Sequence, residues 1–475
     1  MQIPRHGLSK EEVFTALQSF KVYDMDWKSG KVWAYVYNPG EETRQVMTEA
    51  YNMFLTENCL DPSVFPSMLK LETDIVRMVA NLLRGDEGVV GHVTSGGTES
   101  IMLAVKTARD KARAERPDIT TPEMVLPKTA HAAFHKAAHF LGLKPVVTPF
   151  EPSTFRANVQ AMSDAITQNT ILLVASAPSY SQGVIDPIGE IGALAQEKGL
   201  LFHVDACVGG IHLSFMRKMG YPLPDFDFSV PGVTSISADM HKYGYATKGS
   251  STILYRDKSL RRYQIFACTD TTAYTLINPT VLSSKSGGPL AGTWAILNFL
   301  GEAGYEHIVR EVQEATRRLV EGINQIEALR VLGKPDMCMF SFASDVLNVY
   351  QLADEMKKRG WYLQGQFSTP LSPRNLHISV NYGTLTKEDA LLQDLRECVE
   401  IVKKSKPIDT AMIRGEVACL LQNPTPQAFA ALAALAGIQG SELPEEMAMI
   451  NEVLDALPDE LANVLLIDYF NELYV

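Results

Sequence analysis

Short apolar runs alternate with amphipathic stretches between residues 56 and 300. The apolar run at 89–94 precedes 98–111, where Ile101, Ala104, Val105 and Ala108 recur at helical spacing. Further strand-like runs lie at 171–176, 200–204, 233–237 and 251–255, and a helical stretch lies at 188–198. Because strands that alternate with helices of this length are joined by crossover connections, the pattern predicts an α/β domain around a mainly parallel sheet.

The pattern differs on either side of this large domain. Ser9 and Glu12 form a capping-box signature ahead of Val13, so we expect a short helix in an N-terminal arm over residues 1–55. After residue 300 a helical stretch at 307–326 precedes strand-like runs at 337–342 and 376–380 and helical stretches at 349–359 and 387–404. This indicates a smaller α+β domain over 301–475, of which 407–475 is expected to be a helical tail.

Composition narrows the class of protein. The chain has 475 residues, 46% hydrophobic and 21% charged, as is typical of a globular protein. Its net charge of −12 argues against a nucleic-acid partner, since phosphate backbones attract basic surfaces. Six cysteines without paired short spacing predict no metal site and no disulfide framework. No signal-peptide core and no apolar run of 18 residues occur, so we expect a cytoplasmic protein without a membrane span.

Two motifs provide candidate ligand contacts. The glycines of Thr94-Ser-Gly-Gly-Thr-Glu-Ser100 follow a strand and open a helix, where free amides and the helix dipole can hold a phosphate. The alternative is a plain strand-to-helix turn, and the spacing disfavours a nucleotide site. Asp205 ends a buried strand, at the edge where open α/β sheets bind ligands. It either pairs with a protonated pyridine nitrogen or caps the following segment.

A lysine and three histidines complete the candidate chemistry. Lys242 lies among small residues beside His241, and burial is expected to lower its pKa so that a neutral amine can form a Schiff base. His241 is placed to reach a phosphate. His131 is either a ring that stacks on a flat heteroaromatic group or a solvated histidine, and His203 either faces the site with Asp205 or packs in the core. A reactive lysine, an acid at a strand end and a glycine turn are the attachments that pyridoxal 5'-phosphate needs.

With these residues in place, the chain resembles the pyridoxal-phosphate-dependent group II decarboxylase superfamily, and within it the sphingosine-1-phosphate lyase branch. The segments that carry the resemblance are HVTSGGTESIMLAVKTARD (92–110), TAHAAFHKAA (129–138), HVDACVGG (203–210) and SADMHKYGYATKGSS (237–251). The resemblance implies the aspartate-aminotransferase-like fold of type I pyridoxal enzymes, a small-molecule amine substrate and a homodimer with active sites at the subunit interface.

The resemblance also implies roles for individual residues. Lys242 would carry the cofactor covalently, Asp205 would bind its ring nitrogen and His131 would stack on its ring, with Tyr37 and Lys248 as further catalytic groups. The remaining expected cofactor contacts are Gly97, Thr98, His203, Ser237, His241 and Gly288. The expected substrate pocket comprises Asn58, Asp61, Cys207 and Lys285.

The substrate pocket departs from the family pattern, and this leaves the reaction open. Asp61 replaces a histidine and Lys285 replaces an arginine, while Trp33-Ala-Tyr-Val-Tyr37 has bulk where the family has Ser-Gly. An acid at position 61 should disfavour a phosphate anion nearby, by like-charge repulsion. The first alternative is retro-aldol cleavage of a long-chain β-hydroxy amine, with or without a phosphate. The second is decarboxylation of an amino acid, and the third is a catalytically silent scaffold.

Overall fold

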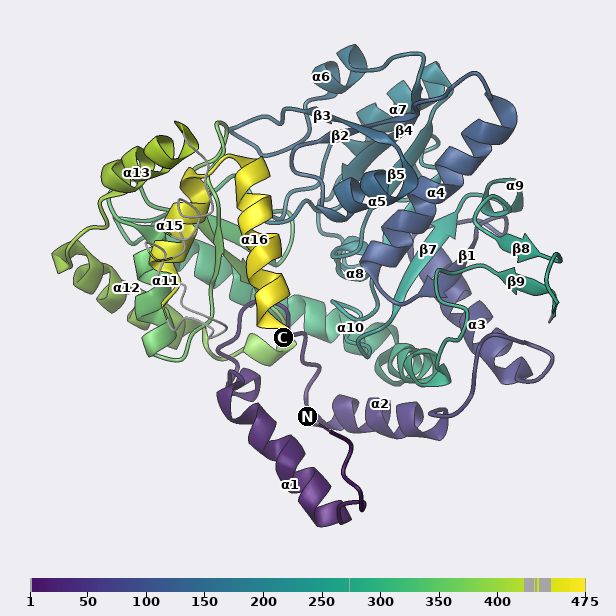
Figure 1. Cartoon of the computed structure of the whole chain (residues 1–475), viewed down its shortest axis with the longest axis horizontal. Helices are drawn as coiled ribbons and strands as arrows, with labels where there is room; N and C mark the ends of the chain where they lie inside the picture. Colours follow the sequence, from purple (N-terminus) through teal and green to yellow (C-terminus); the bar gives the residue numbers. More distant parts are fainter. Residues whose placement is uncertain (1, 273, 423–430, 432–433, 435–445, 475) are drawn as a thin grey trace.

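The computed structural model describes the chain except for residues 1, 273, 423–430, 432–433, 435–445 and 475. A seven-stranded sheet organises the large domain (Figure 1). In spatial order its strands are β1 (Val90–Thr94), β7 (Ser251–Tyr255), β6 (Ser235–Ala238), β5 (Leu201–Asp205), β4 (Thr170–Ser176), β2 (Glu123–Pro127) and β3 (Lys144–Thr148). Only β7 is antiparallel to its neighbours within this sheet, so the prediction of a mainly parallel sheet is confirmed.

Helices cover both faces of this sheet. Alternate residues of β4 show the division, because Leu173 packs into a cluster with α3, α7, α8 and α10 while Leu172 packs against α4 and α5. The helices of this domain, together with α2 from the N-terminal arm, are α2 (Glu41–Met53), α3 (Pro66–Leu82), α4 (Gly97–Glu115), α5 (Ala133–Leu141), α6 (Val159–Asp164), α7 (Ile188–Lys198), α8 (Gly210–Lys218), α9 (Lys258–Arg261) and α10 (Gly287–Asn324). This three-layer arrangement brings the carboxyl ends of β1, β2, β4, β5 and β6 to one edge.

A long helix connects the large and small domains. α10 crosses the expected boundary at residue 300, and Gly301 interrupts it with φ 56° and ψ −174°, a conformation that favours glycine. The small domain has a four-stranded antiparallel sheet flanked by α11 (Val349–Lys358) and α12 (Glu388–Lys404). Its strands, in spatial order, are β10 (Arg330–Val331), β11 (Met339–Ala343), β13 (Asn375–Ser379) and β12 (Gln364–Gln366).

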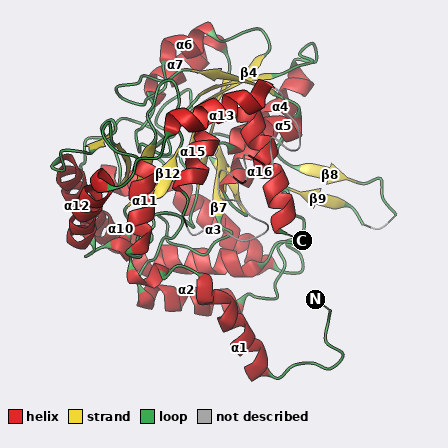
Figure 2. Ribbon diagram, turned by 60° about the vertical axis from the view of Figure 1, so that its left-hand side comes forward, coloured by secondary structure: helices red, strands yellow, loops and turns green. Residues whose placement is uncertain are grey.

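Three further parts surround these two sheets. The C-terminal helices α13 (Thr410–Gln422), α15 (Ala448–Ala456) and α16 (Asp459–Leu473) share a small apolar cluster that includes Ile413 and Val453. The helix α1 (Lys10–Phe20) has the expected capping box at Ser9, and the hairpin of β8 (Phe266–Cys268) and β9 (Leu276–Asn278) extends from the large domain. Both α1 and the hairpin stand away from the body of the molecule in two views (Figures 1 and 2).

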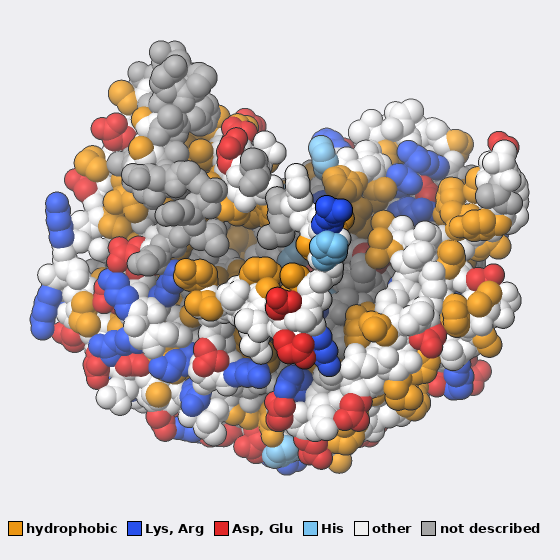
Figure 3. All heavy atoms as spheres, turned by 60° about the horizontal axis from the view of Figure 1, so that its bottom comes forward, with side chains coloured by type: hydrophobic (Ala, Val, Ile, Leu, Met, Phe, Trp, Pro, Cys, Tyr) orange, Lys and Arg blue, Asp and Glu red, His pale blue; other side chains and the backbone are white. Residues whose placement is uncertain are grey.

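The short 3-10 helices are η1 (Lys21–Tyr23), η2 (Trp27–Ser29) and η3 (Tyr382–Thr384). Acidic and basic side chains are intermixed over the face shown in Figure 3. Among the described helices, none combines the length and apolar composition that a bilayer crossing requires.

Candidate active site

A cavity of about 360 Å³ lies at the carboxyl edge of the large sheet. Residues from the ends of β1, β4 and β5 and from the loop after β6 enclose it. Its polar lining includes Ser95, Gly96, Gly97, Thr98, Glu99, His131, Ser176, Tyr180, Asp205, Cys207, Asp239, His241 and Lys242. The structure therefore brings together the glycine turn, the strand-end acid and the lysine that the sequence placed in three separate motifs.

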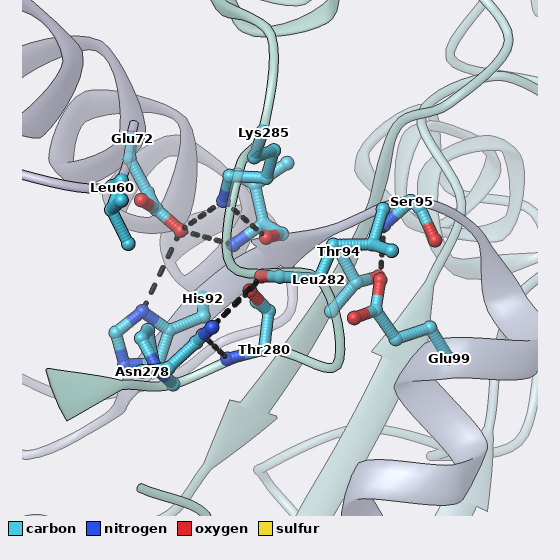
Figure 4. Close-up of polar contacts among 12 residues, drawn as sticks. Leu60, Glu72, His92, Thr94, Ser95, Glu99, Asn278, Thr280, Leu282 and Lys285 are labelled. Atoms are coloured by element: carbon cyan, nitrogen blue, oxygen red, sulfur yellow. Dashed lines mark hydrogen bonds and ion pairs between the residues drawn. The ribbon is translucent and has the colours of Figure 1, made fainter. Parts of the chain in front are cut away.

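The glycine turn is held from both sides. Thr94 Oγ1 and Ser100 Oγ lie 2.7 Å apart beneath it, so the strand end and the first turn of α4 are tied together. The buried carboxylate of Glu99 accepts hydrogen bonds from the amide of Ser95 (2.6 Å) and from the amide of Val281 (2.6 Å). Figure 4 shows Glu99 beside Ser95. Glu99 thus links the turn to the segment after β9, a role that the motif alone did not indicate.

The carboxylate of Asp205 is fixed by its neighbours. The amide of Cys207 donates to Oδ1 at 3.0 Å, and the hydroxyl of Ser237 approaches the same oxygen at 3.4 Å. His203 is fully buried, and its Nδ1 and Nε2 contact the hydroxyls of Ser235 and Ser237 at 2.9 and 3.1 Å. Burial lowers the pKa of His203 to about 4. His203 and Ser237 therefore lie behind Asp205 and orient it, and neither lines the cavity.

Lys242 reaches the cavity with an acidic partner. Its Nζ lies 2.9 Å from Oδ2 of Asp239, a residue that is 2% exposed. Burial alone would lower the pKa of Lys242, but the carboxylate of Asp239 outweighs it and raises that pKa above the ordinary value. The expected lowering of this pKa is therefore wrong, because the carboxylate three residues before the lysine stabilises its protonated form.

Tyr37 and Lys248 form a second polar group beside Lys242. The ammonium of Lys248 lies 5.1 Å from the centroid of the Tyr37 ring, and it donates to the carbonyl of Tyr35 at 3.1 Å. Burial raises the pKa of the Tyr37 hydroxyl to about 12, so it stays protonated at neutral pH. Burial, together with the charge of Lys242, lowers the pKa of Lys248. The pKa values of the two lysines are therefore shifted in opposite directions. Such opposite shifts are typical of residue pairs with distinct acid and base roles.

The two histidines of the lining are placed differently. His131 is exposed at the start of the segment before α5, and its Nδ1 accepts a hydrogen bond from the amide of Ala133 at 3.1 Å. His241 is mostly buried, its Nε2 lies 3.5 Å from Asp239, and its Nδ1 has no hydrogen-bond partner among the described residues. Burial lowers the pKa of His241, which leaves an imidazole able to contact a ligand in the cavity.

This residue set fits pyridoxal 5'-phosphate. The turn at Gly96 and Gly97 opens the 19-residue helix α4 onto the cavity, where an anion can bind. The unpartnered Nδ1 of His241 lies on the wall of the same cavity, while Asp205 and Lys242 offer an acid and an amine. A phosphate, a ring nitrogen and an aldehyde are the three groups that such residues recognise.

Most of the expected substrate-pocket residues lie elsewhere. Asp61 lines a second cavity of about 680 Å³, together with Cys59, Glu72 and His92. Asp61 is exposed, and its Oδ1 accepts from the amide and hydroxyl of Ser63 at 2.8 and 2.6 Å. Only Cys207 of the expected pocket lines the first cavity. Within one copy of the chain, Asp61 therefore contacts Ser63 and solvent and lies apart from the first cavity.

Polar contacts hold the side chain of Lys285 in place beside this second cavity (Figure 4). Its Nζ donates to the carbonyl of Val93 at 2.9 Å and lies 3.3 Å from Oε1 of Glu72. Asn58 accepts from the amide of Lys285 at 3.2 Å. Gly288 lies at the start of α10, where an added Cβ would meet the ring of Tyr51 at 2.8 Å, and it does not line the first cavity.

Comparison with known proteins identifies the relatives of this chain. Residues 3–344 match the model of the pyridoxal-dependent decarboxylase conserved domain, and residues 414–472 match that of a putative HTH domain at the C-terminus of pyridoxal-dependent enzymes. The sphingosine-1-phosphate lyase of Arabidopsis thaliana is 42% identical over 84% of this chain and 74% of its own. Sphingosine-1-phosphate lyase 1 of Rattus norvegicus is 40% identical over 86% of this chain and 72% of its own.

Solved structures agree with these relationships. The sphingosine-1-phosphate lyase of Burkholderia pseudomallei superimposes with a TM-score of 0.81 at 38% identity and covers 90% of this chain and 97% of its own. The glutamate decarboxylase of Lactobacillus brevis has a TM-score of 0.75 at 19% identity, over 86% of this chain and 96% of its own. The second similarity shows a shared fold.

Proposed function

Because the chain belongs to the pyridoxal-dependent decarboxylase family, we propose that it is a pyridoxal-phosphate-dependent aldehyde-lyase. Its substrate is a phosphorylated long-chain β-hydroxy amine such as sphingosine 1-phosphate, which it cleaves to a fatty aldehyde and phosphoethanolamine. The observation that carries this proposal is the similarity to sphingosine-1-phosphate lyases over most of both chains. The cavity supports it, because Lys242, Asp205 and the glycine turn meet there.

The residues of the first cavity bind and orient the cofactor in this proposal. When bound, pyridoxal phosphate supplies an aldehyde that joins to amines and a protonated ring that withdraws electrons from the bond to be cleaved. Gly97, Thr98 and His241 would hold the phosphate, and His131 would contact the ring. Asp205 would bind the ring nitrogen, and the hydrogen bond from the Cys207 amide fixes the direction of its carboxylate.

Lys248 is the proton acceptor that the geometry favours. The substrate hydroxyl must lose its proton before the adjacent carbon–carbon bond breaks. Tyr37 remains protonated because its pKa is raised to about 12. Lys248 has a lowered pKa, and in its neutral form it would take up this proton at its Nζ, which two backbone carbonyls hold over the ring of Tyr37. Tyr37 then serves as a hydrogen-bond donor beside it.

Product analysis tests this function. The pure protein is loaded with pyridoxal phosphate and incubated with sphingosine 1-phosphate, and the products are identified by mass spectrometry. Phosphoethanolamine together with a fatty aldehyde is expected, and the Lys242→Ala variant serves as the matched inactive control. If the loaded protein yields neither product, the lyase proposal is refuted. An amino-acid panel scored for carbon dioxide then tests decarboxylation.

We further propose that two copies of the chain form a dimer through the face around the second cavity. Large apolar side chains are exposed on this face, and exposed apolar patches of this kind mark interaction sites. They include Leu55, Val64, Leu69, Tyr274, Ile277 and Val281, each more than half exposed. The second copy is the favoured occupant because Asn58 and Asp61, the expected substrate contacts, lie beside this face and apart from the lining of the first cavity.

Sedimentation analysis with paired variants tests the dimer. Ile277→Asp places a charge on the proposed interface and is expected to shift the protein toward the monomer. Val346→Asp is the matched control, since Val346 is 72% exposed on the small domain and outside this face. A wild-type monomer, or an unchanged dimer in the Ile277 variant, would refute this interface.

We also propose a cytoplasmic location. The six cysteines are free thiols, and five of them are buried or partly buried, namely Cys59, Cys207, Cys268, Cys338 and Cys398. Reduced thiols are the usual state in the cytosol. Fractionation of cells that produce the protein tests this location, and recovery in a membrane fraction would contradict it.

A further inference from the structure

Asp239 is a buried acid that the functional motifs did not single out. It is the first residue after β6, and its side chain is 1% exposed. Burial would raise the pKa of this carboxyl, but Lys242, His241 and a hydrogen bond from Ser251 lower it. Its compensation comes from two cations or potential cations, Lys242 at 2.9 Å and His241 at 3.5 Å. A buried carboxylate is costly unless a neighbouring cation stays charged, and Lys242 is the nearer of the two.

The position of Asp239 is fixed by the glycine turn. A Cβ added to Gly97 would lie 2.8 Å from Oδ2 of Asp239 and 2.8 Å from Sγ of Cys207. The backbone of Gly97 therefore rests directly on the carboxylate. On its other side Asp239 meets Nζ of Lys242, so the acid lies between the phosphate turn and the reactive amine. This contact fixes Nζ relative to the cofactor site.

The other groups that face Lys242 cannot replace this partner. Burial raises the pKa of the Cys207 thiol and of the Tyr37 hydroxyl, so both stay neutral. Lys248 and His241 cannot carry a negative charge. When protonated they repel the charge of Lys242, and when neutral they leave it unaffected. The charge of Asp205, whose carboxylate accepts from the amide of Cys207, also raises the pKa of Lys242 but less than that of Asp239 does. Within the described residues around the cavity, Asp239 is thus the acid in ion-pair contact with Nζ.

We propose that Asp239 is a positioning residue that holds the nitrogen of Lys242 against the glycine turn and keeps that nitrogen protonated. This inference rests on the proposed function only in that Lys242 carries the cofactor. It adds a residue that sets the protonation state of the covalent link.

A pH titration of the loaded protein tests the proposal without turnover. Pyridoxal phosphate joined to a lysine absorbs at different wavelengths when the linking nitrogen is protonated or neutral, so absorbance against pH gives the midpoint for that nitrogen. Asp239→Asn keeps the size of the side chain and removes the charge. We expect its midpoint to fall by about one to three pH units, because an opposite charge at this distance favours the protonated form to that extent.

Asp186→Asn is the matched control for loss of a buried carboxylate. Asp186 is fully buried at the same end of the sheet, and it accepts from the amides of Ala157 and Ser176 at 2.8 Å each. Its midpoint is expected to equal that of the wild type. A wild-type midpoint in the Asp239 variant overturns the proposal. If the wild-type protein forms no covalent link at all, the proposed function fails, and the cofactor-free measurement below still decides the ion pair.

A double-mutant cycle on the cofactor-free protein provides this second measurement. Thermal unfolding is compared for Asp239→Asn, Lys242→Met and the double variant. Lys242→Met alone leaves an uncompensated buried carboxylate, so we expect it to lower the melting temperature more than the double variant does. Additive effects of the two substitutions would show that the residues are not coupled and would overturn the proposal.

Discussion

Glu72→Gln is the substitution for which the structure gives the most definite expectation of stability. The carboxylate of Glu72 lies 3.3 Å from Nζ of Lys285 and accepts from the amide of Val93 at 2.8 Å. Both side chains are largely buried, with 16% and 12% exposed. Burial would raise the pKa of Glu72, but Lys285 and the hydrogen bonds outweigh it and lower that pKa to about 2.

The size of the effect follows from this pKa. The unfolded chain has a glutamate pKa of 4.5, so the gap is roughly 2.5 pH units at about 1.4 kcal/mol each. The ionised carboxylate therefore contributes about 3 kcal/mol to the free energy of unfolding at pH 7. Because the folded pKa is the lower one, this contribution is complete above pH 4.5 and is lost as the pH falls toward 2. At pH 3 about 1.4 kcal/mol remains.

Urea unfolding followed by tryptophan fluorescence measures this difference. At pH 7 Glu72→Gln is expected to lose about 3 kcal/mol, since Lys285 is left buried without its counter-charge. The loss should shrink to about half at pH 3. Glu314→Gln is the control, because Glu314 pairs with Arg317 on an exposed helix surface, where solvent screens the pair and its loss should change stability little. A variant as stable as the wild type at pH 7, or a loss that does not shrink with acid, would refute the reasoning.

Further predictions concern the first cavity and Asp61. Lys242→Ala should abolish fixation of pyridoxal phosphate by borohydride, and mass spectrometry that still finds a fixed cofactor would assign the link to another lysine. Asp205→Asn should retain the cofactor but lower turnover roughly 100-fold, the scale of a lost electrostatic contact, and near-normal turnover would remove Asp205 from the ring nitrogen. Gly97→Ala should weaken cofactor binding in an absorbance titration, because its Cβ would displace Asp239; unchanged affinity would contradict that contact. Asp61→His should lower the KM for sphingosine 1-phosphate, because the proposed dimer brings this like charge to the substrate phosphate, and an unchanged KM would place Asp61 away from the substrate.

The large-domain fold could be predicted closely because its signals are local. The apolar run of β4 and the amphipathic run of α7 agree with the structure to within about one residue, since period and flanking turn residues determine both. α10 begins at Gly287, about 20 residues before the expected helix. A helix start among Gly and Pro residues has little helical propensity of its own and depends on packing against α2 and α3.

Candidate site residues divide in the same way. Asp205, Gly97 and Lys242 could be located because each lies at a recognisable strand end, helix start or loop. The partners that determine the chemistry of these residues could not be located from the sequence. Nothing local shows that Lys285 turns inward to Glu72, 213 positions away, or that Glu99 binds an amide 182 positions away.

Asp239 shows why a residue inside a motif can still be missed. Asp239 lies three positions before Lys242, and the sequence alone does not distinguish it from any acidic residue that follows a strand. Its effect depends on burial, because the same pair in water would interact by about 1 kcal/mol. In the fold the pair is enclosed by Gly97 and Cys207, so the charge of Asp239 raises the pKa of Lys242 when burial alone would lower it. The protonation of the reactive amine is therefore a property of the packed site, and composition around the lysine predicted the opposite sign.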